Sequence, residues 1–101
     1  MQNLRVYSLA KEFYWLVIQL KLAPELNGQL RRAAVSIINN IAEGSSRRTL
    51  PDRLRFYDMA FGSAKECIGV LETARISDFT LVDRADHLAA CLYKMSRFKR
   101  N

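Results

Sequence analysis

The stretch that most constrains the fold of this chain runs from residue 29 to residue 44 and reads QLRRAAVSIINNIAEG. Its apolar side chains recur at the three- and four-residue spacing of one helix face, at Leu30, Ala34, Ile37 and Ile41. Polar side chains occupy the opposite face, at Gln29, Arg32, Ser36, Asn40 and Glu43. Because amphipathic segments of this kind bury their apolar face, we expect a core-facing helix, closed at Gly44 by a left-handed residue.

Three further segments also have helical periodicity. The first runs from residue 4 to residue 21, the next begins near residue 50, and the last ends near residue 97. Side chains that commonly cap helices precede each of them. The expected caps, in chain order, are Asn3, the pair Thr49 and Asp52, and the pair Thr80 and Asp83. Residues 22–27, which contain Pro24 and precede Gly28, are expected to turn the chain between the first two helices.

The apolar faces of these segments define the expected core. They comprise Val6, Ala10, Phe13, Val17 and Leu20 in the first segment, Phe56, Ala60, Ser63, Cys67, Leu71 and Ala74 in the next, and Leu81, Ala85, Leu88, Leu92 and Met95 in the last. Tyr57, Ala64 and Ile68 are expected to broaden the apolar face of the segment that begins near residue 50 on one flank. Four amphipathic helices with short connections pack as an antiparallel up-down bundle. We therefore predict an all-α fold in which residues 1–101 form a single four-helix-bundle domain.

The composition and the N-terminal residues indicate the cellular location of the chain. Its apolar runs are short and interrupted, so we expect no transmembrane helix and no membrane partner. The N-terminal residues lack the layout of a signal peptide, and a cytoplasmic protein is expected. Cys67 and Cys91 are the only cysteines. A disulfide is compatible with the sequence, but two buried thiols in a reduced protein are favoured.

The segments Gln29–Ile37 and Asn40–Gly44 resemble the signature of the proteins encoded in 23S ribosomal RNA intervening sequences. These are small bacterial four-helix proteins related to the accessory proteins of diversity-generating retroelements. The resemblance implies a ring-like homopentamer and a nucleic-acid-handling partner such as a reverse transcriptase. The family typically has a proline after the Ser-Ile pair, whereas this chain has Ile38, so we expect a straighter second helix.

Basic residues gather around the connection that follows residue 44, in a chain whose net charge is +6. The candidates are Arg47, Arg48, Arg53 and Arg55, with Arg31 upstream. Such a cluster is typical of a solvated bundle end, and it is also what holds nucleic-acid phosphates without reading sequence. Because no base-reading motif is recognisable, these arginines are candidate RNA- or DNA-binding residues without sequence specificity. The tail from residue 97 to residue 100 is basic as well and is expected to fray.

Four polar residues of the second helix form a row, Arg32, Ser36, Asn40 and Glu43. The structural interpretation is a hydrogen-bonded row that joins this helix to a neighbour, with Arg32 and Glu43 offsetting each other's charge through a shared partner. The functional alternative is a ligand or nucleotide contact at the same row. If these groups are buried, each needs a partner, because an unsatisfied polar group costs about 1–3 kcal/mol.

Three residues on outward faces are candidates for an oligomer interface. Trp15 lies on the polar side of the first helix, where it either lies flat on the surface or anchors a neighbouring subunit. Gly62 and Gly69 share an outward row of the third helix. Since each interior glycine costs about 1 kcal/mol relative to alanine, the pair indicates close approach of another helix, in the same chain or, as we favour, in a second copy.

Catalytic chemistry has little support in the sequence. His87 is the only histidine and falls on a polar helix face, where a solvated surface role is favoured. Neither metal-ligand spacing nor a phosphate-binding glycine loop is present, so we predict no enzymatic activity, cofactor or metal. Our hypothesis is a self-associating helical protein that offers a basic surface to RNA or to a nucleic-acid-handling partner. The alternative is a protein–protein adapter with no nucleic-acid contact.

Overall fold

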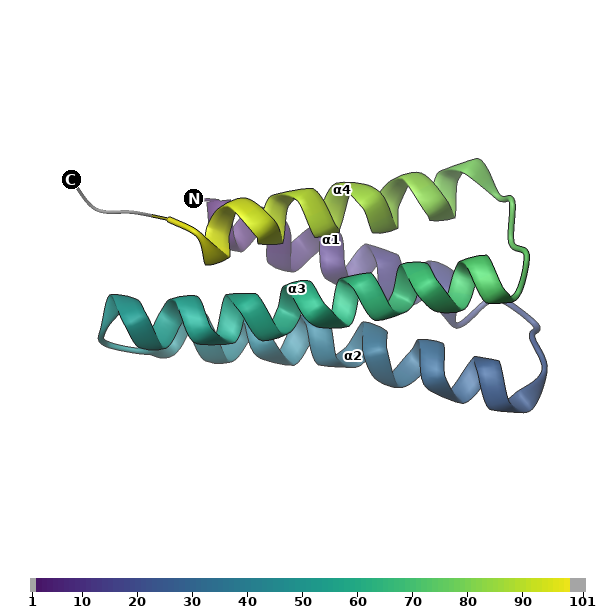
Figure 1. Cartoon of the computed structure of the whole chain (residues 1–101), viewed down its shortest axis with the longest axis horizontal. Coiled ribbons are helices and arrows are strands. Elements are labelled where there is room, and N and C mark those ends of the chain that lie inside the picture. Colours follow the sequence, from purple (N-terminus) through teal and green to yellow (C-terminus); the bar gives the residue numbers. More distant parts are fainter. Residues whose placement is uncertain (1, 99–101) are drawn as a thin grey trace.

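The chain is an all-α bundle of four helices, as the apolar spacing predicts. The computed structural model describes residues 2–98. Its helices are α1 (Gln2–Val17), α2 (Pro24–Ser46), α3 (Leu50–Thr73) and α4 (Phe79–Ser96). They run up and down along one long axis (Figure 1). Each helix packs against the next in the order α1, α2, α3, α4 and back to α1, so that α1 and α3 face each other diagonally.

The core lies between the apolar faces that the spacing identifies. Leu30, Ala34, Ile37 and Ile41 of α2 are all 1 % exposed or less. The expected inward residues of α1 and α4 are buried too, apart from Leu20 and Met95, which are partly exposed. Full burial of one such aliphatic side chain contributes about 1.5–3 kcal/mol of folding free energy. The hydrophobic stripes therefore specify the packing of these three helices.

The buried face of α3 is rotated modestly toward the flank on which Tyr57 and Ala64 were expected to broaden it. Its buried residues are Tyr57, Ala60, Ala64, Cys67, Val70 and Leu71. Phe56, Ser63 and Ala74 were expected to face inward and are only half-buried. The rotation follows from the pairing of α3 with both α2 and α4, which turns Ser63 toward α2 and Phe61 toward α4.

The helix boundaries shift where turn chemistry competes with periodicity. α1 ends at Val17, four residues before the expected end, and the following backbone tightens into bonds such as Leu20 N to Val17 O at 3.0 Å. α2 begins at Pro24, where the fixed backbone angle of proline suits a first helical turn. The expected turn over residues 22–27 is therefore wrong from Pro24 onward, because these residues already form the first turn of α2. α2 then continues without interruption through Ile38.

The caps confirm one expectation and correct two. Thr49 caps α3, because its Oγ1 accepts a hydrogen bond from the Asp52 amide at 3.3 Å. α4 is capped by the carboxylate of Asp78, which accepts from a backbone amide in the first turn at 3.0 Å, and Thr80 lies inside the helix. Asn3 also lies within a helix, since α1 already includes Gln2.

Gly44 has a different role from the one that the sequence indicates. No glycine among residues 2–98 has a positive φ, so Gly44 does not close α2 in a left-handed conformation. It is a buried helical residue, and α2 continues past it to Ser46. A Cβ atom at Gly44 would lie 2.6 Å from Cε1 of Tyr57 and 3.1 Å from Cβ of Phe56. The glycine thus allows α3 to approach the last turn of α2.

Candidate nucleic-acid interface

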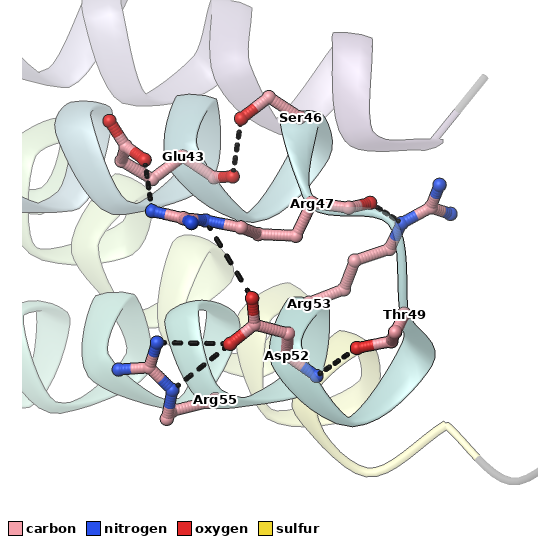
Figure 2. Close-up of polar contacts among 7 residues, drawn as sticks. All are labelled: Glu43, Ser46, Arg47, Thr49, Asp52, Arg53 and Arg55. Carbon is pink, nitrogen blue, oxygen red and sulfur yellow. Dashed lines mark hydrogen bonds and ion pairs between the residues drawn. The ribbon is translucent and has the colours of Figure 1, made fainter.

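Four of the candidate arginines meet where α2 passes into α3. We call this group, Arg47, Arg48, Arg53 and Arg55, the basic turn. α2 ends at Ser46, and α3 begins at Leu50, after a connection of extended backbone at Arg47 (φ −78°, ψ 148°) and Thr49. The Thr49 cap and Pro51 in the first turn fix the start of α3. This short connection brings residues from both helices together at one end of the bundle (Figure 2).

Two of these arginines are already paired with carboxylates. Arg47 Nη2 lies 2.8 Å from Glu43 Oε2, and Arg47 Nε lies 3.8 Å from Asp52 Oδ2. Arg55 binds Asp52 Oδ1 through Nη2 at 2.9 Å and Nε at 3.3 Å. Both guanidinium groups also lie over the Phe56 ring, with Cζ 4.6 Å and 4.4 Å from its centroid. These contacts tie Arg47 and Arg55 to the protein and offset their charge.

The other two arginines keep their charge available. Arg53 uses Nε to donate to the Arg47 carbonyl at 2.7 Å, and the rest of its guanidinium group points away from the helices (Figure 2). Arg48 is exposed on the connection itself. Within residues 2–98, neither forms an ion pair with a carboxylate. An open hollow of about 340 Å³ lies beside Arg48, lined also by Thr49 and Asp52.

Arg31 does not join the basic turn. It precedes Arg47, the residue that follows α2, by sixteen residues, which corresponds to about 24 Å along the helix axis. Its Nη2 donates to the carbonyl oxygen of Ile18 at 3.0 Å. That carbonyl follows the C-terminal end of α1, where a cation is favoured by the helix dipole. Arg31 therefore contacts the α1–α2 connection at the far end of α2.

The predicted polar row of α2 divides into two parts. Ser63 Oγ of α3 donates to Ser36 Oγ at 2.8 Å, and Asn40 Nδ2 donates to the same oxygen at 3.1 Å and to the Ser36 carbonyl at 2.9 Å. The Ser63–Ser36 bond joins α2 to α3, whereas both Asn40 bonds lie within α2. Arg32 and Glu43 are exposed, and Glu43 pairs with Arg47 instead of sharing a partner with Arg32.

The candidate interface residues lie on two different sides of the bundle. The Trp15 side chain is 60 % exposed on α1, and its ring meets the Tyr14 ring edge-on at 5.9 Å between centroids. Gly62 and Gly69 lie on the outer face of α3, and a Cβ atom at either would meet nothing within 4 Å. Because α1 and α3 are diagonal in the bundle, the tryptophan and the glycines do not form one continuous patch.

The thiols and the histidine lie away from the basic turn. Cys67 is fully buried, and desolvation, with a smaller contribution from the charge of Glu66, raises its pKa to about 12. Cys91 is partly exposed, and its Sγ lies 3.7 Å from Nε2 of His87. In the part of the chain that the structure describes, no three His, Cys, Asp or Glu side chains converge as metal ligands. None of the described helices is long and apolar enough to span a bilayer.

One arrangement near the end of α4 was missed by the sequence analysis. Arg97 was expected to fray with the basic tail, yet its guanidinium Cζ lies 3.9 Å from the centroid of the Tyr93 ring and 5.4 Å from that of Phe61. Its Nη1 lies 3.6 Å from Asp58 Oδ1. The last two residues of that tail, 99 and 100, lie outside the described part of the chain. The four-residue spacing of Tyr93 and Arg97 was the available signal, because such residues are neighbours on a helix.

The fold defines a small all-α protein built as a four-helix bundle. The chain belongs to the 23S rRNA-intervening sequence protein family, whose profile matches residues 2–99. The family's description names no enzymatic activity. A comparison with curated proteins found no match, and a comparison with solved structures found none either.

Proposed function

We propose that this protein is a non-enzymatic RNA-binding protein that holds phosphates of the RNA backbone through Arg48 and Arg53. The observation that carries the proposal is the division of charge within the basic turn. Glu43 and Asp52 compensate Arg47 and Arg55, whereas no carboxylate compensates Arg48 and Arg53 among the described residues. The family's link to an intervening sequence of ribosomal RNA agrees with this chemistry.

The two pairs of arginines have different roles in this proposal. Arg47 braces the turn by approaching Asp52 across it, Arg55 binds the same carboxylate from within α3, and both guanidinium groups cover Phe56. Arg48 and Arg53 present guanidinium groups that can bind phosphate oxygens in a bidentate manner. Contacts of this kind neutralise phosphates and release counterions, so affinity falls with salt and carries no sequence preference.

The experiment compares two matched double variants in fluorescence anisotropy with a labelled RNA oligonucleotide. Arg48→Ala with Arg53→Ala removes the uncompensated charges of the basic turn. Arg5→Ala with Lys21→Ala removes the same charge from exposed positions elsewhere. We expect the first variant to lose several-fold to tenfold in affinity at low salt and the control to lose far less. Equal losses would show only a general charge effect, and no binding by the wild type would favour the protein–protein adapter.

We also propose that the chain self-associates through the outer face of α3, as a homopentamer if the family resemblance extends to assembly. Two interior glycines cost a helix about 2 kcal/mol in total. Open space above Gly62 and Gly69 means that no neighbour within the described part of the chain accounts for them. A helix from a second copy could approach closely over such a row.

A further inference from the structure

An aromatic and cationic stack lies on the face formed by α3 and α4. The ring of Phe61 on α3 meets the ring of Tyr93 on α4 edge-on, with 5.5 Å between centroids and 64° between planes. The guanidinium group of Arg97 lies over Tyr93 at 3.9 Å, as described above. We call Phe61, Tyr93 and Arg97 the aromatic stack. Phe98, which follows it, is 57 % exposed.

We propose that the aromatic stack binds unpaired bases of the RNA strand whose phosphates the basic turn holds. This inference rests on the proposed function and gives that function a substrate class, single-stranded RNA. Unpaired bases stack on aromatic rings and on guanidinium planes, because each base has an apolar π-face. Bases inside a duplex are already stacked and cannot do so without being displaced.

The exposure of the stack distinguishes a binding surface from a simple tie between helices. Tyr93 is 49 % exposed, although a ring that only joined α3 to α4 would be stabilised further by burial. The Arg97 side chain is 46 % exposed and has Asp58 as its only carboxylate partner in the described chain. That pair is long, at 3.6 Å, and the Asp58 side chain is 63 % exposed, so the pair contributes little stability. Contact of Arg97 with a base or a phosphate can replace its ion pair with Asp58 at a small cost in free energy.

The position of the stack matches a strand that crosses the basic turn. Arg55 and Asp58 are three residues apart on α3, so they are neighbours on its surface about one turn apart. Asp58 contacts Arg97, which places the end of α4 beside the first half of α3 (Figure 1). A strand held at the α2–α3 connection can therefore continue along α3 onto Tyr93. The charge of Arg97 is complementary to the phosphates of that strand.

The test measures binding of a single-stranded RNA and of the same RNA annealed to its complement, with three variants of α4. Tyr93→Ala removes the ring, Tyr93→Phe keeps it, and Phe79→Ala removes a ring that is 79 % exposed at the opposite end of the same helix. We expect Tyr93→Ala to weaken single-strand binding about 5- to 150-fold, the range for loss of one base–aromatic stack. We expect duplex binding to change little, and the other two variants to remain close to the wild type.

A second measurement uses the wild-type protein, so it does not depend on whether a variant folds. A single-stranded RNA carrying 2-aminopurine loses emission when that base stacks, so it reports stacking on the wild-type protein. Loss of emission on binding supports the inference, whereas bound RNA with unchanged emission at every position overturns it. Unaltered single-strand affinity in folded Tyr93→Ala also overturns it and leaves the basic turn as the binding site. Failure of the wild type to bind any RNA overturns the proposed function itself.

Discussion

The close approach at Gly44 gives the most quantitative prediction. In Gly44→Ala the new Cβ atom meets the Tyr57 ring at 2.6 Å and 2.8 Å, which is too short for any real contact. The ring is 8 % exposed, and its hydroxyl lies 3.3 Å from Ser45 Oγ, so it cannot move aside freely. Overpacking of this kind costs about 1–3 kcal/mol. Alanine regains about 1 kcal/mol of helix propensity, and the net destabilisation is about 0–2 kcal/mol.

A matched control isolates the contact itself. Gly28 lies in the same helix, and a Cβ atom there would meet only the flexible end of Arg32, at 3.4 Å. The gain in helix propensity is shared by both substitutions, so Gly44→Ala should be about 1–3 kcal/mol less stable than Gly28→Ala. Urea unfolding followed by circular dichroism measures this difference, provided that all proteins are compared at one concentration. Equal stability of the two variants would refute the close-packing role of Gly44.

Two further predictions concern assembly and the thiols. Gly62→Leu with Gly69→Leu should preserve the fold of the monomer, because a Cβ atom at either position meets nothing within 4 Å. The double variant should lower the oligomer mass measured by light scattering. An unchanged oligomer mass would exclude this interface. Cys91 should react with a thiol reagent at neutral pH, while Cys67 should react only in denaturant, because burial raises its pKa from 9.0 to about 12. The folded state keeps Cys67 protonated, so its contribution to stability is present below pH 9 and is lost as the pH rises toward 12.

The sequence predicts the bundle well because burial follows helical periodicity. The spacing of Leu30, Ala34, Ile37 and Ile41 is a local property, and these four residues are buried as expected. The role of Gly44 could not be predicted in the same way. A glycine near the end of a periodic segment commonly closes a helix, and only the position of Tyr57 on the next helix shows that it serves close packing.

The candidate site was predictable in composition but not in electrostatics. The arginines of the basic turn can be counted along the chain, whereas their pairing depends on how the α2–α3 connection folds. Helical spacing suggested that Arg32 and Glu43 offset each other's charge through a shared partner, yet Arg47, one turn beyond Glu43, reaches its carboxylate at 2.8 Å. Asp52 approaches Arg47 across the connection only after the chain has turned. Arg48 and Arg53 can be recognised as the arginines without a carboxylate partner among the described residues only once these pairs are known.

The salt dependence of RNA binding tests the central claim most directly. For single strands, the slope of log K against log salt concentration changes by about 0.7 for each phosphate contact. We predict that Arg48→Ala with Arg53→Ala makes this slope shallower by about 1.4, whereas Arg5→Ala with Lys21→Ala leaves it near the wild-type value. A wild-type slope near zero, or a slope that the basic-turn variant does not change, would contradict the account.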